Sequence, residues 1–233
     1  GNTGSSATAT LNLDNAPIGY SVTADDSLIN AAEAISASFT LAGAEVDAVY
    51  NYTITSSGGE GSVTGSGTVY LAIQQVTGID VSTLPDGTLT FSVTLSDTTG
   101  NVGQVVTASA TLDATAPSGY SVTADDSQID ATEASATSFT LAGAEIDASY
   151  YYTISSSGGG TPVTGNGTVS SATQQVTGID VSTLPGGTLT FSVTLSDAAG
   201  NVGETVTATA TLDNVPSGYT IAADDSLIGA AEA

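Results

Sequence analysis

The stretch LTFSVTLSDTTGNVGQVVTASATLD, residues 89–113, decides the fold. Apolar and polar residues alternate through LTFSVTLSD and again through VVTASATLD, and both runs are rich in Val and Thr. Alternation with a period of two is typical of half-buried β-strands. The intervening cluster DTTGN carries the Asp, Gly and Asn residues that favour turns. The stretch therefore predicts two antiparallel strands joined by a turn.

The same signals recur on the N-terminal side of this stretch. SFTL and YNYTIT alternate in the same way, and AGAEVDA, SSGGEG and LPDGT separate the strands as turns. Only INAAEA, residues 29–34, could form a helical turn, and it is too short to be stable alone. We expect seven strands, at residues 19–23, 35–42, 48–55, 62–65, 67–77, 88–96 and 103–112. Such a series of short strands in about 100 residues predicts an all-β fold, an immunoglobulin-like β-sandwich.

The predicted module is repeated along the chain. Residues 17–113 align with residues 117–213 without a gap and differ at 24 of 97 positions. A unit of about 100 residues has the usual size of one domain. We therefore expect tandem Ig-like modules at 15–114 and 115–214, the last strand of a preceding module or an N-terminal fragment at 1–14, and the first strand of a following module at 215–233.

The core of each module must form without the residues that antibody domains use. The chain has no Cys and no Trp, so the Cys–Trp–Cys core of antibody domains is absent. The apolar residues of the predicted strands have to fill the space between the sheets instead. In the first module we expect this core to contain Phe39, Tyr50, Tyr52, Phe91 and Leu95.

The charge of the chain excludes several classes of function. It has 24 acidic residues and no Lys, Arg or His, which gives a formal net charge of −24. No side-chain salt bridge can form, and nucleic acid is excluded as a partner because phosphate binding needs basic residues. An anionic membrane surface would repel the chain, so we expect no direct membrane binding. We also expect no enzymatic activity, because the usual nucleophiles and bases are missing and a carboxylate-pair glycosidase would need aromatic platforms.

The predicted topology concentrates acidic residues at the joints between modules. If successive strands alternate in direction, the end of one module and the start of the next gather Asp25, Asp26, Glu33, Asp113, Glu145, Asp147, Asp197 and Asn201. Clustered carboxylates repel one another, and Ca²⁺ would relieve this because it binds about 6–8 oxygen ligands. Zn²⁺ and Cu²⁺ would require His or Cys. The alternative is that these acids are only solvated charges, which is what we expect of the variable Glu60, Asp86, Asp130 and Glu204.

Four segments resemble a known family. VTADDSLINAAEA (22–34), SDTTGNVG (96–103), SDAAGNVG (196–203) and ATLDATAP (110–117) are similar to the bacterial Ig-like extender repeats of large type I-secreted RTX adhesins of the biofilm type. The resemblance implies a calcium-stiffened rod at the bacterial cell surface that holds an adhesive domain away from the cell. It also implies a set of Ca²⁺ ligands: Asp25, Asp26, Glu33, Asp97, Asn101, Asp113, Asp125, Asp126, Glu133, Asp197, Asn201 and Asp213.

The function predicted from the sequence is therefore that of an extracellular spacer, whose partners are the neighbouring modules of the same chain. One alternative is a filament subunit that polymerises by strand complementation through its orphan terminal strands. A minor alternative is a carbohydrate-binding module that uses Tyr70 or Tyr151. These tyrosines are not repeated, because Ser170 and Asn51 stand at the equivalent positions, which favours surface drift.

Overall fold

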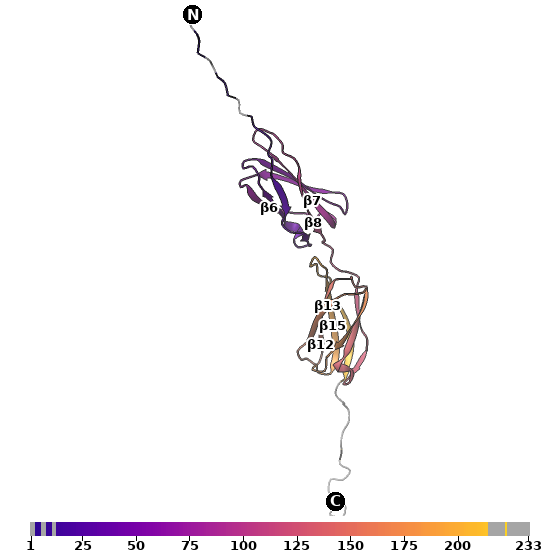
Figure 1. The fold of residues 1–233 in the computed structure, drawn as a ribbon. Helices are drawn as coiled ribbons and strands as arrows, with labels where there is room; N and C mark the ends of the chain where they lie inside the picture. The colour runs from indigo at the N-terminus through magenta and orange to yellow at the C-terminus, as the bar shows by residue number, and fades with distance from the viewer. Residues whose placement is uncertain (1–2, 6–7, 11–12, 214–221, 223–233) are drawn as a thin grey trace, which may run out of the picture. The chain divides into compact units, whose positions relative to one another are not determined.

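The computed structural model describes residues 3–5, 8–10, 13–213 and 222, which divide into two compact units. Each unit contains one β-sandwich, so the predicted all-β, immunoglobulin-like fold is confirmed (Figure 1). The elements of the first module are β1 (Ser21–Ala24), β2 (Leu28–Ile29), η1 (Ala34–Ser36), β3 (Ala37–Ala42), β4 (Val49–Ser56), β5 (Ser62–Thr68), β6 (Ile73–Ile79), β7 (Gly87–Ser96) and β8 (Val106–Leu112). Those of the second are β9 (Ser121–Ala124), β10 (Gln128–Asp130), η2 (Glu133–Ser135), β11 (Thr137–Ala142), β12 (Ser149–Ser156), β13 (Val163–Thr168), β14 (Thr173–Ile179), β15 (Gly187–Ser196) and β16 (Val206–Asp213).

Both modules have the same sheet topology. In the first, a three-stranded sheet of order β1-β3-β6 faces a five-stranded sheet of order β2-β8-β7-β4-β5. In the second, the corresponding sheets are β9-β11-β14 and β10-β16-β15-β12-β13. The strand pairs are antiparallel except for β2 with β8 and β10 with β16. The stretch 89–113 provides most of β7 and all of β8, the antiparallel pair predicted from its alternation.

Two strands form in the region predicted, but the predicted bounds of 62–65 and 67–77 are wrong. Residues 62–68 form the single strand β5, which pairs with β4 from Thr55↔Ser62 to Val49↔Thr68. The chain then crosses to the other sheet, where β6 begins at Ile73. Gln74 fixes this crossing, since its side-chain oxygen accepts the Tyr70 N–H at 2.6 Å and its amide donates to the Thr68 carbonyl at 3.0 Å. Residues 69–73, VYLAI, form an unbroken apolar run through the crossing, so no polar turn signal marked the break.

The segment between β1 and β3 contains a helical turn, as predicted. It is the short 3₁₀ turn η1, preceded by β2, which the sequence analysis did not predict. In β2, Ile29 lies opposite Leu112 of β8 and is 2% exposed. A strand of two residues is too short to produce a periodic signal.

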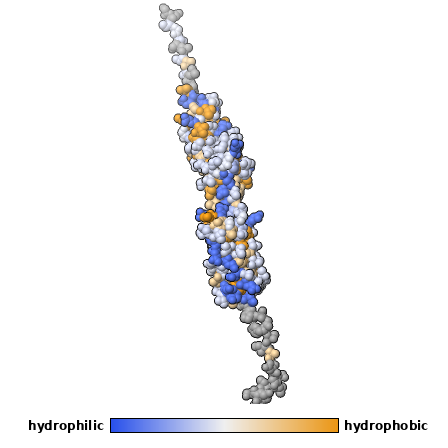
Figure 2. Space-filling view, turned by 90° about the vertical axis from the view of Figure 1, so that its right-hand side faces the viewer, coloured by the Kyte–Doolittle hydropathy of each residue, from blue (hydrophilic) through white to orange (hydrophobic). Residues whose placement is uncertain are grey.

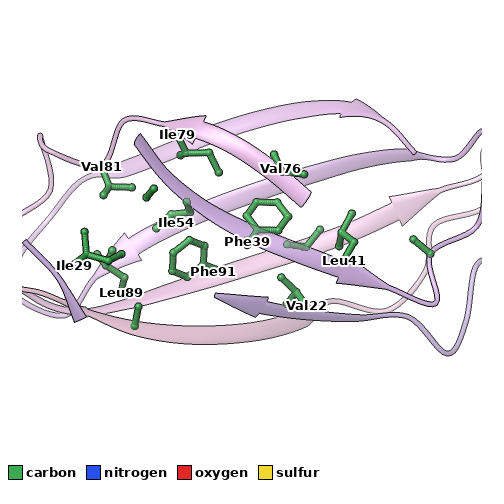
Figure 3. Close-up of a cluster of buried hydrophobic side chains, with 14 of the residues drawn as sticks. Val22, Ile29, Phe39, Leu41, Ile54, Val76, Ile79, Val81, Leu89 and Phe91 are labelled. Atoms are coloured by element: carbon green, nitrogen blue, oxygen red, sulfur yellow. The ribbon is translucent and has the colours of Figure 1, made fainter. Parts of the chain in front are cut away.

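Aromatic rings fill the core, as predicted. Phe39, Phe91 and Leu95 are fully buried between the sheets, and Figure 3 shows the two Phe rings next to each other. The Phe39 ring meets the Tyr52 ring edge-on, with centroids 5.5 Å apart, and the Phe91 ring at 6.2 Å. Tyr50 and Tyr52 are only partly buried and lie at the margin of this core. The second module repeats the arrangement around Phe139.

Two glycines of the edge strand β5 make room for these tyrosines. Gly65 lies opposite Tyr52 in the register, and Gly67 lies opposite Tyr50. A Cβ atom on Gly65 would stand 2.3 Å from the Tyr52 hydroxyl oxygen, and one on Gly67 would stand 2.4 Å from that of Tyr50. The tyrosine rings therefore cover the glycine backbone and close the edge of the core, a known device for edge glycines.

A buried tyrosine connects the start of each module to its last two strands. The Tyr20 hydroxyl accepts a hydrogen bond from the Leu95 N–H at 3.3 Å and donates one to the Gln104 carbonyl. Gly103 lies beneath this contact, and a Cβ atom there would approach the Pro17 carbonyl oxygen to 2.5 Å. The last Gly of the SDTTGNVG motif is therefore required by close packing against the incoming chain. Tyr120 and Gly203 repeat the arrangement in the second module.

Each module has an entry end, where the chain arrives, and an exit end, where it leaves. In the first module we define the entry end as residues 43–48, 69–72 and 97–105, and the exit end as 25–36, 57–61, 80–86 and Asp113. The described acidic residues lie in loops, at the last residue of a strand or, for Glu133, in the short turn η2, so the faces of the sheets carry little charge. Figure 2 accordingly shows a surface of mostly intermediate hydropathy, with small hydrophilic and hydrophobic groups.

The described residues show neither of the two predicted terminal strands. Residues 8–10 and 13–14 of the N-terminal segment have no regular secondary structure. Apart from Ala222, the segment 215–233 lies outside the described residues. The strand complementation hypothesis depends on these two segments.

Candidate functional site: the acidic ends of the modules

Asp25 lies on the outer face of the three-stranded sheet. Its carboxylate accepts hydrogen bonds from the hydroxyls of Ser38 and Thr40, both at 2.6 Å, and from the side-chain amide of Gln75 at 2.8 Å. Desolvation acts to raise the pKa of Asp25, but these three hydrogen bonds outweigh it and lower the pKa. Asp125 has the same arrangement with Ser138, Thr140 and Gln175. Hydroxyl and amide donors therefore compensate this charge in the absence of basic residues.

The rest of the ADDSLINAAEA motif shapes the turns of the exit end. Asp26 accepts the N–H of Leu28 at 3.1 Å. Asn30 accepts the Glu33 N–H at 3.0 Å, and the Glu33 carboxylate accepts the Asn30 N–H at 3.0 Å. This reciprocal pair is a capping box around the short turn before η1. The motif thus has a structural role that does not depend on a cation.

In the second module, three acidic residues line one hollow at the exit end. The hollow has a volume of about 300 Å³ and is bordered by Asp130, Glu133 and Asp213, together with Gln128, Ile129 and Thr211. Asp130 and Asp213 are direct partners in the parallel pairing of β10 with β16. Hydrogen bonds from the backbone N–H groups of Glu133 and Thr132 lower the pKa of Asp130. Glu133 and Asp213 were predicted as ligands, whereas Asp130 was expected to be only solvated.

At the entry end of the first module, Asp97 organises the turn between β7 and β8. Its carboxylate accepts the N–H groups of Thr99 and Asn101, each at 2.9 Å, and the side-chain amide of Asn101 at 2.8 Å. The Thr99 hydroxyl also donates to the carboxylate of Asp14 at 3.0 Å. Asp14 belongs to the LDNAP joint, as Asp113 belongs to LDATAP. A joint aspartate therefore lies against the SDxxGN turn of the module that it precedes.

These contacts predict a specific dependence of stability on pH. Desolvation opposes ionisation of Asp97, but the hydrogen bonds from Asn101 and Thr99 prevail and lower its pKa from 3.8 to about 2. A carboxyl with a lower pKa in the folded state stabilises the fold above its unfolded pKa, and this contribution is lost as the pH falls through the folded value. We expect the first module to lose stability as the pH falls from about 4 to about 2, with a shallower loss in Asp97→Asn.

Urea unfolding over this pH range, followed by amide NMR signals of each module, checks the prediction. Asp47→Asn is the matched control, because Asp47 is exposed in the same end and Asn tolerates its positive φ of 68°. An Asp97→Asn profile parallel to that of the unmodified chain would contradict the role of Asp97.

The other predicted residues of the entry ends differ in their exposure. Glu45 and Asp47 lie in the turn between β3 and β4, as Glu145 and Asp147 do between β11 and β12. The N–H of Asp147 donates to the Val169 carbonyl at 2.8 Å, and the residue is exposed. Asp197 and Asn201 lie in the turn after β15 and are 8% and 7% exposed.

Asp86 has a role that the sequence analysis missed, because it was expected to be only solvated. Its carboxylate accepts the N–H of Ala114 at 2.8 Å and the hydroxyl of Thr115 at 2.5 Å. These are the residues that follow Asp113 in the LDATAP joint. In the second module Gly186 replaces it, so this attachment is particular to the first module. In the sequence, an Asp followed by a Gly predicts only a turn, so this contact with a distant segment could not be predicted.

The structure brings only some of the predicted Ca²⁺ ligands close to one another. Glu133 and Asp213 share a hollow, whereas Asp25 and Asp125 lie on sheet faces with their own donors. In the part of the chain that the structure describes, no three acidic side chains lie close enough together to hold a metal ion as they stand. Cation binding at the exit end would therefore require the carboxylates to turn toward the ion.

Solved structures that are similar to this chain include parts of adhesins and fibronectin(III)-like modules. The sequence matches no protein-family model and no curated protein. It is similar to the tetra-tandem repeat in the extending region of a large adhesion protein, with 26% identity and a TM-score of 0.39 over 84% of this chain and 50% of that chain. A structure from a 1.5-MDa bacterial ice-binding adhesin shows 19% identity and a TM-score of 0.45 over 86% of this chain and 67% of that chain.

The fibronectin(III)-like modules of Clostridium thermocellum CbhA are also similar. They show 12% identity and a TM-score of 0.43 over 86% of this chain and 100% of that chain. The present chain spans about half the length of the extending-region structure. Among the described residues, no helix is long and apolar enough to cross a membrane.

Proposed function

We propose that this chain is a spacer in a bacterial cell-surface adhesin, stiffened by calcium bound at the acidic ends of its modules. The observation that carries the proposal is the distribution of charge over two nearly identical sandwiches. Apart from Asp25 and Asp125, whose carboxylates lie on the outer face of the three-stranded sheets, acidic side chains are confined to the ends at which the chain enters and leaves each module, while the sheet faces carry mainly Ser, Thr and Gln. In a tandem chain, this pattern concentrates like charge at the joints.

Charge confined to the joints makes a spacer sensitive to cations. Carboxylates near a joint repel one another, and the repulsion is stronger where water is excluded. A hard divalent cation removes the repulsion and links the groups that it binds. Without the cation the joints would be free to bend, and with it they would stiffen. The contact of Asp14 with Thr99 supports this view, because it fixes a joint carboxylate to the module that follows.

Calcium fits the exit end better than other metals. Asp130, Glu133 and Asp213 offer three carboxylates around one hollow, and Gln128 and Thr211 add neutral oxygen atoms. Ca²⁺ accepts about 6–8 such ligands in flexible geometry, whereas Mg²⁺ demands an octahedron and retains its waters. A dissociation constant of about 10⁻⁴–10⁻³ M would suit an extracellular location, where calcium is abundant. The partners in this role are neighbouring modules of the same chain.

Calorimetric titration of the full chain with CaCl₂ tests the cation site. The double variant Glu133→Gln, Asp213→Asn is expected to lose one calcium-binding step, because two of the three carboxylates become neutral. Glu204→Gln is the matched control: it removes an exposed charge at the entry end of the same module, and Gln104 occupies this position in the first. Equal calcium binding by the double variant and the control would rule out the exit-end site.

A further inference from the structure

The second module has a hollow on the outer face of its five-stranded sheet, next to the entry end but lined by uncharged residues. It lies over β12, β13 and β15 and has a volume of about 550 Å³, within the usual range for small-ligand sites. The residues that line it are Ser149, Tyr150, Tyr151, Asn166, Gly167, Thr168, Thr194, Leu195, Ser196 and Val202. No Asp or Glu is among them, which is unusual for a chain of charge −24.

Tyr151 is the exposed aromatic residue of this surface, with half of its side chain accessible (50%). It lies opposite Asn166 of β13 and opposite Thr194 of β15. Ser149, two residues earlier on the same face, lies opposite Thr168 and Ser196. The ring is therefore surrounded by one amide and several hydroxyl groups, each of which can donate and accept hydrogen bonds.

The first module lacks this combination on the same face. Asn51 replaces the tyrosine, Val49 replaces Ser149 and Ser66 replaces Asn166, while the remaining hydroxyl positions are unchanged as Thr68, Thr94 and Ser96. The three changes involve two adjacent strands and adjacent positions in the register, Val49–Asn51 on β4 and Ser66 on β5. On the sequence alone the unrepeated Tyr151 favours surface drift, but the structure shows that the three differences lie together on one face, with the aromatic ring opposite the amide.

We propose that this hollow is a binding site for a neutral carbohydrate. An exposed tyrosine ring offers an apolar face on which the C–H groups of a pyranose ring can stack. The amide of Asn166 and the surrounding hydroxyls supply the alternating donors and acceptors that sugar hydroxyls require. Uronic acids and sulfated sugars are disfavoured, because the strongly negative chain repels anions and offers no basic side chain.

The chemistry favours a sugar over a proline-rich peptide. Peptides in the polyproline II conformation dock in grooves lined by several aromatic residues. Tyr150 also borders the hollow, but it is 9% exposed and its ring covers Gly167. This leaves Tyr151 as the aromatic ring that a ligand can reach among the residues that line the hollow. The site is independent of calcium and of the proposed spacer function.

NMR titration of the full, ¹⁵N-labelled chain tests the proposal. The probes are neutral hexasaccharides of glucose, mannose, galactose and xylose, with a proline-rich decapeptide as the competing class. We expect at least one hexasaccharide to shift the amides of β12, β13 and β15 and to leave those of β4, β5 and β7 unchanged. Tyr151→Asn, which introduces the residue of the first module, is expected to weaken binding about tenfold, the value of one aromatic contact.

The outcomes separate the possibilities. Saccharide binding in the hollow that is weakened by Tyr151→Asn supports the proposal. The same shifts in both modules, an unchanged affinity in Tyr151→Asn, or shifts caused by the peptide alone would overturn it, as would the absence of shifts with every hexasaccharide. Tyr70→Ser is the matched control, since it also replaces an exposed tyrosine by the residue of the other module.

Discussion

Replacing Phe39 by alanine is expected to lower the free energy of unfolding of the first module by about 3–5 kcal/mol. The Phe39 side chain is fully buried between the two sheets and meets the rings of Tyr52 and Phe91 edge-on. Its removal deletes apolar contacts and leaves a cavity that rigid strands on both sides cannot fill. Without Cys or Trp, Phe39 and Phe91 are the largest side chains at the centre of the module.

Urea unfolding followed by amide NMR signals of each module measures this effect. The second module serves as an internal reference, because Phe139 occupies the equivalent position and remains intact. Tyr70→Ala is the matched control, because Tyr70 is 73% exposed and its loss should change stability by less than about 0.5 kcal/mol. A Phe39→Ala effect below that of the control would show that the aromatic cluster does not hold the sandwich together.

Replacing Gly103 by valine should destabilise the first module by about 3 kcal/mol. Even the Cβ atom would approach the Pro17 carbonyl oxygen to 2.5 Å and the Tyr20 hydroxyl oxygen to 2.9 Å. Because the first of these is a backbone atom, the incoming chain has to move away from β8. That movement would also break the hydrogen bonds of the Tyr20 hydroxyl with Leu95 and Gln104.

Val102→Ala provides the control for this variant. Val102 precedes the glycine but is 60% exposed, so its truncation should change stability by less than about 0.5 kcal/mol. The same urea and NMR measurement compares the two variants. The equivalent change Gly203→Val should lower the stability of the second module and leave that of the first unchanged. If Gly103→Val were as stable as Val102→Ala, the attachment of the incoming chain through Tyr20 would not contribute to stability.

The sequence allowed much of the fold to be predicted, because alternation reports burial directly. In β7, Leu89, Phe91, Val93 and Leu95 point into the core, as their spacing indicated. The method failed where a strand was too short, as in β2, or where the unbroken apolar run 69–73 covered the change of sheet between β5 and β6. Such a crossing is set by individual side-chain hydrogen bonds, here those of Gln74 with Tyr70 and Thr68, which leave no periodic signal.

The candidate site was less predictable, because its charges are compensated by groups distant in the sequence. Asp25 depends on Ser38, Thr40 and Gln75, which are ordinary surface residues of strands. Asp86 binds a joint 28 residues away. The missing basic residues indicated that the carboxylates needed other partners, but only the structure shows that hydroxyl and backbone N–H donors supply many of them.

Asp130 is a residue whose place in the candidate site could not be predicted from the sequence. It was expected to be only solvated, since the first module has Asn30 at this position. The parallel pairing of β10 with β16 places it beside Asp213, in the hollow that Glu133 also borders. A parallel pair between segments more than 80 residues apart could not be inferred from either segment alone.

Titration of the full chain with calcium, following melting temperature and small-angle X-ray scattering together, tests the central claim most directly. At ten times the dissociation constant, each site should add about 1.4 kcal/mol of stability, or roughly 5–10 °C in melting temperature. We predict this stabilisation together with an increase in the maximum dimension, both reversed by EDTA and smaller with Mg²⁺. If neither quantity changed beyond the effect of NaCl at the same ionic strength, the claim of a calcium-stiffened spacer would be contradicted.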